Sequence, residues 1–130
     1  MIELYESLIR DFAKLHGLPS ETLLLTGELN LGEVAVSLIY EGDETSGEIT
    51  LVGEIGWPKS GNELEMYKAM LQGNLLWAGT SGATLALDEQ KGAVACARVA
   101  LEELNAERLT DLITEFADTV GFWRGYLARA

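Results

Sequence analysis

The segment from Asn62 to Gly92 places a helix directly before a two-stranded hairpin, and this order constrains the fold more than any other stretch. Apolar side chains recur in its first part at offsets of three and four, which predicts one face of an amphipathic helix. These side chains are Leu64, Tyr67, Met70 and Leu71. Charged residues occupy the opposite side of that helix, so the apolar face is expected to be covered by protein rather than by water.

The second part of this segment predicts a hairpin. Small residues at 79–82 interrupt the helical pattern, and a strand is expected at 83–87. Turn-forming residues follow at 88–92, and a returning strand is expected at 93–99. The sequence therefore predicts a domain that mixes helices with an antiparallel sheet.

The chain begins with a second amphipathic pattern. Its apolar stripe predicts a helix that ends near His16, because Gly17 suits a helix C-cap and Pro19 prevents continuation. The stripe consists of Ile2, Tyr5, Leu8, Ile9, Phe12 and Leu15. We interpret His16, the single histidine, as a helix-end or surface residue rather than a catalyst.

Between residues 22 and 56 the apolar period changes from 3.6 to 2, which predicts a three-stranded meander. We expect a short strand at 23–28, a longer one at 34–40 and a returning strand at 49–55. If the more apolar face packs on helices, Ile39 and Val52 lie on the opposite face as exposed apolar positions.

The last third of the chain carries the clearest helical period. It is marked by Leu109, Leu112, Ile113, Phe116, Val120, Trp123 and Leu127. The whole chain then reads α-β-β-β-α-β-β-α, an α/β (α+β) sandwich in which an antiparallel sheet packs on helices. With 130 residues and 48% hydrophobic content, we expect residues 1–130 to form one domain.

The charge of the chain limits its partners. Nine basic and 21 acidic residues give a net charge of −12, which repels nucleic acid and anionic lipid. We expect no membrane insertion and no secretion signal, and a lone cysteine, Cys96, agrees with the reducing cytoplasm. The acidity alone fits both a small soluble protein and a carrier of a basic or aggregation-prone client.

No catalytic motif is evident. One histidine and one cysteine are too few for a zinc site or a histidine-based nucleophile. The Gly-Thr-Ser-Gly sequence at 79–82 is neither a G-x-S-x-G elbow nor a phosphate loop, so a helix-to-strand link is the better interpretation. The acids at 41–44 lack the spacing of an EF-hand. We predict no enzyme activity, no cofactor and no bound metal.

The run LLWAGTSGATLALDEQKGAVACARVALEELN, with Trp123 near the end of the final helix, resembles the C-terminal half of class I type III secretion chaperones, the Tir-chaperone-like family. Length, order of elements and acidity also agree. Where related chains often have Ala-Asn at the end of the second helix, this one has Gly73-Asn74. The resemblance rests on apolar and turn positions rather than on a reactive motif.

The resemblance implies a cytoplasmic homodimer that binds the N-terminal segment of a type III secreted effector in extended form and keeps it soluble, without ATP. It also implies a dimer interface built on the second helix and the following strand, at 64–77 and 84–87. The interface residues predicted by position are Leu64, Tyr67, Met70, Leu71, Leu75, Trp77 and Leu85. On pattern alone, the alternative that these side chains belong to the core of a monomer stays open.

We expect the effector-binding groove to combine apolar positions with an acidic rim. Ile39 and Val52 of the meander meet this condition, with Phe12 and Leu15 of the first helix as a neighbouring patch. Two other functions stay open: a small dimeric adaptor or scaffold for a folded partner, and a carboxylate-based hydrolase. The sequence does not name an effector.

Overall fold

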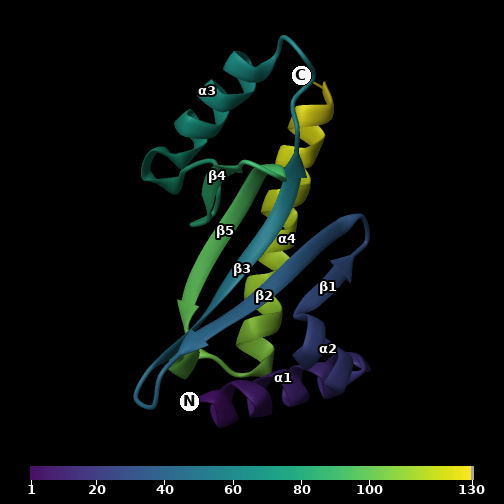
Figure 1. The fold of residues 1–130 in the computed structure, drawn as a ribbon, viewed down its shortest axis with the longest axis vertical. Coiled ribbons are helices and arrows are strands. Elements are labelled where there is room, and N and C mark those ends of the chain that lie inside the picture. Colours follow the sequence, from purple (N-terminus) through teal and green to yellow (C-terminus); the bar gives the residue numbers. More distant parts are fainter. Residues whose placement is uncertain (130) are drawn as a thin grey trace.

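Five antiparallel strands form a single sheet in the order β1-β2-β3-β5-β4 (Figure 1). The structure is a computed structural model, and it describes residues 1–129. The strands are β1 (Glu28–Leu31), β2 (Val34–Gly42), β3 (Gly47–Gly56), β4 (Thr84–Asp88) and β5 (Gly92–Ala100). β3 is central and β1 and β4 form the two edges, so within the described residues each edge strand has a partner on one side only.

The helices supply a second layer on one face of the sheet. α4 packs along β2 and β3. α1 lies across the N-terminal end of α4, and α3 projects beside β4 (Figure 1). The helices are α1 (Ile2–His16), α2 (Ser20–Thr26), α3 (Glu63–Asn74) and α4 (Ala106–Arg129), with 3-10 turns η1 (Leu75–Trp77) and η2 (Leu101–Glu103). This arrangement confirms the predicted α+β sandwich and its element order, with α2 as an addition.

The predicted strand at 23–28 is wrong, because this segment is helical up to Thr26 and the first strand starts at Glu28. A short run of leucines does not distinguish a helix from a strand. Gly27 ends the helix with φ 66°, and its N–H donates to the Leu23 carbonyl at 2.8 Å. A Cβ atom at Gly27 would lie 2.5 Å from the Leu38 carbonyl oxygen, so this approach of the chain to β2 requires glycine.

The register of β2 and β3 confirms which side chains of the meander face outward. Leu38 pairs with Leu51, and both are buried against the helices. The adjacent positions Ile39 and Val52 point to the opposite face, where Ile39 is 45% exposed. No described helix covers that face.

α4 approaches the sheet closely at Gly53. A Cβ atom there would lie 2.6 Å from Val120 Cγ2, so the absence of a side chain allows the helix to settle on β3. The core between the layers includes the fully buried side chains Ile9, Val36, Ile49, Ile113 and Val120. These residues come from α1, β2, β3 and α4, which explains why these elements form one packed unit.

α3 is fixed to the rest of the molecule by Trp123. The indole lies against Gly73, where a Cβ atom would be 2.7 Å from Trp123 Cζ2, and its Nε1 donates to the Gly79 carbonyl at 3.0 Å. Asn74 then pairs with the backbone of Leu85 in β4, donating at 2.9 Å and accepting at 2.8 Å. The end of α3 is thereby held to both α4 and β4.

These contacts correct the predicted buried face of α3. Met66 and Met70 point to the core, whereas Leu64 and Leu71 are 73% and 71% exposed. Sequence periodicity grouped Met70 with Leu64 and Leu71 on one face. In the structure, the contact between Gly73 and Trp123 orients α3 so that its methionines face the core. The second apolar stripe of α3 is therefore uncovered in the single chain.

Two helical glycines provide a test of this packing. Gly73→Ala should destabilise the protein by about 1–3 kcal/mol, because the new methyl group overlaps the Trp123 ring. Gly121→Ala should stabilise it by up to about 1 kcal/mol, because the nearest atom is Val34 Cγ2 at 3.8 Å and alanine favours the helix. Urea unfolding measures both values. Equal effects of the two substitutions would contradict the close contact at Gly73.

Candidate functional site

A groove lies between α1, the edge strand β1 and α4, and encloses about 380 Å³. We call it the α1–β1 groove. Its apolar lining consists of Phe12, Leu18, Leu29, Leu31 and Ile113. β1 pairs only with β2, so the backbone groups on its other edge have no strand partner within residues 1–129. An apolar groove beside an open strand edge is the arrangement that binds extended peptides.

His16 closes one end of this groove. Its Nε2 lies 2.7 Å from Thr110 Oγ1, and its ring centroid lies 4.6 Å from that of Phe12. The side chain therefore links the end of α1 to α4 across the groove. This position supports a structural part for His16.

A second uncovered surface lies on α3 and η1. We call it the α3 face and define it as Leu64, Tyr67, Leu71, Leu75 and Trp77. The three leucines are between 70% and 73% exposed, and Leu87 of the neighbouring β4 is 54% exposed. Large apolar side chains are thus concentrated and exposed on one protruding element of the described chain.

Backbone strain accompanies the exposed side chains of η1. Leu76 and Trp77 have φ values of 52° and 56°, in a left-handed region that costs about 1–2 kcal/mol per residue without glycine. The strain is held in place because the Gly79 N–H donates to the Gly73 carbonyl at 3.1 Å. Leu76 is 81% exposed, so burial of its side chain within the protomer does not offset the strain.

Comparison with known proteins assigns this architecture. A model of the Tir chaperone protein (CesT) family matches residues 7–124. The chain belongs to this family. The match includes the greater part of α1, the complete sheet and α4 up to Arg124, so both the α1–β1 groove and the α3 face lie within the CesT-family region. The search of curated proteins gave no match.

Solved structures share the fold of this CesT-family chain. A chain of the HopA1–SchA chaperone–effector complex superposes with a TM-score of 0.73 at 20% identity, over 94% of each chain. The ExsC–ExsE complex gives 0.75 at 22% identity, over 95% of this chain and 92% of that one. The ExoU–SpcU complex of the Pseudomonas aeruginosa type III secretion system gives 0.59 at 22%, over 81% and 84%.

The structure separates the predicted effector-binding residues into two groups. Phe12 lines the α1–β1 groove, and Leu15 is 53% exposed nearby on α1 but outside its lining. Ile39 and Val52 share the uncovered face of the sheet. Tyr40 stacks on Tyr5 of α1 at 4.7 Å, so α1 lies on the opposite face from Ile39. The four residues do not form one patch.

The predicted dimer residues also divide. Leu64, Leu71, Leu75 and Trp77 are exposed, and Tyr67 is half-buried. Met70 and Leu85 are each 5% exposed, so both side chains already belong to the core of the protomer.

Sequence reasoning missed Leu18, Leu29 and Leu31 of the α1–β1 groove, because the segment before β1 was expected to be a strand. The glycine at 27 was the available signal that a helix ends there.

The residues considered for chemistry have structural contacts. Thr80 is 1% exposed and its hydroxyl donates to the Trp77 carbonyl at 3.4 Å, within the link between η1 and β4. Within residues 1–129, no three His, Cys, Asp or Glu side chains come together as metal ligands. In the same range, none of the helices has the length and apolar character needed to span a bilayer.

Asp43 organises the β2–β3 turn. One oxygen of its carboxylate accepts from the backbone N–H of Thr45 at 2.8 Å and of Ser46 at 2.9 Å, and from the Thr45 hydroxyl at 3.0 Å. The backbone donors, first that of Thr45 and then that of Ser46, hold the pKa of Asp43 below its ordinary value. Because the ionised form is favoured in the folded state, its contribution is present at neutral pH and is lost as the pH falls through the lowered pKa.

This interpretation predicts a measurable titration. The carboxyl carbon resonance of Asp43, followed by NMR, should titrate with a midpoint below about 3.9, the ordinary value for Asp. Thr45→Val removes the hydroxyl donor but keeps the backbone N–H, so it should move the midpoint only part of the way back. A wild-type midpoint at or above the ordinary value would contradict the turn geometry.

Proposed function

We propose that this chain is a dimeric chaperone that binds the N-terminal segment of a type III secreted effector in extended form and keeps it soluble for secretion. The observation that carries the proposal is the α1–β1 groove beside the open edge of β1. Membership of the CesT family supports it, as do structural relatives that were solved as the HopA1–SchA chaperone–effector complex and as the heterodimeric ExoU–SpcU complex of a type III secretion system.

The groove has the physical requirements for an extended client. A client strand added to β1 gains backbone hydrogen bonds that do not depend on its sequence, and its alternate side chains enter the apolar lining. Leu29 and Leu31 occupy alternate positions of β1 and point into the groove, which sets the spacing of the client side chains. A volume of about 380 Å³ accommodates a small number of apolar side chains.

The charge of the chain suits a carrier with exposed apolar surface. A net charge of −12 makes two empty copies repel each other, which limits self-association through the groove. Glu28 lies in the groove lining, so acidic character extends to the binding surface itself. A client that is neutral or basic avoids this repulsion.

The dimer is proposed to form through the α3 face. A specific interface of this kind buries about 1,200–2,000 Å² in total, and the exposed leucines of α3 supply its apolar centre. Burial of the apolar side chains of η1 against a partner also offsets the backbone strain of these residues.

We further propose that the chain is a single cytoplasmic domain that acts without catalysis, cofactor or metal.

Leu18→Asp tests the groove. Leu18 is 37% exposed and lines the α1–β1 groove, so a charge there should weaken binding of an effector N-terminal fragment without unfolding the chaperone. A docked apolar side chain contributes about 1.5–3 kcal/mol, so calorimetry should show at least roughly tenfold weaker binding. Fragments are taken from the secreted effectors of the source organism, beginning with any encoded beside the chaperone gene.

Leu25→Asp is the matched control, because Leu25 is 86% exposed and lies outside the groove lining. It should leave the affinity unchanged. The double variant Ile39→Asp/Val52→Asp tests the uncovered sheet face in the same assay. Loss of binding in that variant, with Leu18→Asp unaffected, would move the client site to the other face of the sheet. If only intact folded effectors bind, the chain is an adaptor for a folded partner.

Leu71→Glu tests the dimer. Leu71 is 71% exposed at the centre of the α3 face, so a buried charge at the interface should convert the dimer to a monomer. Sedimentation at micromolar concentration measures the state, and Leu25→Glu is the control on another exposed leucine. Met70 is unsuitable for this test because its side chain lies in the core. A wild-type monomer would refute the proposed interface.

A further inference from the structure

Within residues 1–129, the C-terminal part of β5 lacks a strand partner on its outer side. β4 pairs with residues 92–96 of β5 and then ends, whereas β3 pairs with β5 as far as Ala100. Residues 97–100 therefore have an open edge, on which no strand within residues 1–129 lies. Alternate residues of that stretch direct backbone N–H and C=O groups away from β3. This edge lies on the side of the sheet opposite β1.

The edge is open because the chain bends away just before β4. Ser81 and Gly82 have φ values of 52° and 91°, which turn the link from η1 toward α4 instead of continuing along β5. The link is fastened there by the hydrogen bond from Trp123 Nε1 to the Gly79 carbonyl. The bend leaves a space between the link, β5 and α4.

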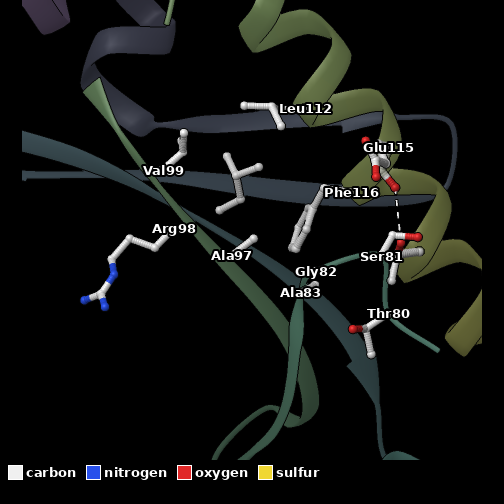
Figure 2. A pocket seen from close by; sticks show the side chains of 12 residues that line it. Thr80, Ser81, Gly82, Ala83, Ala97, Arg98, Val99, Leu112, Glu115 and Phe116 are labelled. Atoms are coloured by element: carbon white, nitrogen blue, oxygen red, sulfur yellow. Dashed lines mark hydrogen bonds between the residues drawn. The ribbon is translucent and has the colours of Figure 1, made fainter. Parts of the chain in front are cut away.

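That space is a pocket of about 220 Å³. In Figure 2 the side chains of Val99, Leu112 and Phe116 converge on it. The rest of its wall includes the small residues Gly82, Ala83 and Ala97 and the polar residues Thr80, Ser81, Glu115 and Thr119. Arg98 also borders the pocket but its side chain extends away from the other lining residues (Figure 2), and it pairs with Glu48 at 3.5 Å. The pocket is thus mainly apolar, and the guanidinium does not enter it.

The pocket continues along α4. An adjoining hollow of about 460 Å³ shares Ser81, Glu115 and Thr119 with it and reaches Phe122, which is 57% exposed. We call the open edge, the pocket and this hollow together the β5 groove. Glu115 and Asp118 form its acidic rim. Within residues 1–129 neither carboxylate has a salt-bridge partner.

We propose that the β5 groove binds a second extended segment of the client, with one apolar side chain in the pocket and a lysine or arginine beside Glu115 and Asp118. The open edge supplies sequence-independent hydrogen bonds, the pocket selects an apolar side chain, and the acidic rim selects a basic neighbour. The β5 groove is separate from the α1–β1 groove. This inference therefore rests on the proposed function only in taking the bound segment to be part of an effector.

A short peptide tests the recognition directly. The probe is Ac-Thr-Lys-Thr-Leu-Thr-Lys-Thr-NH2, in which leucine and both lysines share one face of a strand in either direction. Titration into the ¹⁵N-labelled full chain should give saturable amide shifts at residues 97–100 and at Ser81. The same peptide with glutamate in place of lysine should bind about tenfold more weakly, since two exposed ion pairs become repulsive. Absence of saturable shifts, or equal binding of both peptides, overturns the proposal.

Charge reversal supplies the matched variants. Glu115→Lys/Asp118→Lys should reverse the preference between the two peptides, because both carboxylates are exposed and belong to the rim. Glu44→Lys/Glu89→Lys makes the same change in net charge at exposed turn residues elsewhere and should leave the preference unchanged. Shifts at residues 97–100 on dilution of the protein alone would show that a second copy covers the groove, which also overturns the proposal.

The effector fragment separates this inference from the proposed function. If the second segment docks here, Glu115→Lys/Asp118→Lys weakens fragment binding about tenfold and the effect adds to that of Leu18→Asp. If Leu18→Asp weakens binding and the rim variant does not, the β5 groove is not a client site and the proposed function stands. Failure of every fragment to bind the wild-type protein would overturn the proposed function itself.

Discussion

The packing of Trp123 against Gly73 is the contact on which two uncovered surfaces of this protein, the α3 face and the β5 groove, depend. It holds α3 to α4, and the hydrogen bond from its indole to Gly79 fixes the link that leads into β4. With α3 held in this rotation, the methionines face the core and the leucines face solvent. The same anchored link bends away from β5 and leaves its edge open. One buried aromatic residue thus positions both the α3 face and the β5 groove.

A sheet with helices on one face and open strands at both edges is suited to holding an unfolded client. Strand edges offer hydrogen bonds to any backbone, and the apolar grooves beside them add selectivity through side chains. Two such grooves lie on opposite edges here, beside β1 and β5. Edges of this kind are also a risk for aggregation, and the net charge of −12 counters that risk by repulsion between copies.

Periodicity located most of the elements because it reports which residues must leave water. The apolar stripes of α1 and α4 and the alternation of β2 and β3 were predicted and confirmed, including the outward direction of Ile39. It failed at residues 23–28, where three leucines fit a helix and a strand equally, and the glycine at 27 decided the boundary. It also failed to choose between two apolar stripes on α3, since both satisfy the helical period.

The sequence by itself determined the class of fold, the family resemblance and the acidic surface, because periodicity, turn residues and charge are local properties of the chain. Only the tertiary structure decided which apolar residues stay exposed. Met70 and Leu71 are neighbours with similar hydrophobicity, yet one is 5% and the other 71% exposed. That difference comes from contacts between residues far apart in sequence, such as Gly73 with Trp123. Grooves at strand edges have the same origin, since they depend on where the next element ends.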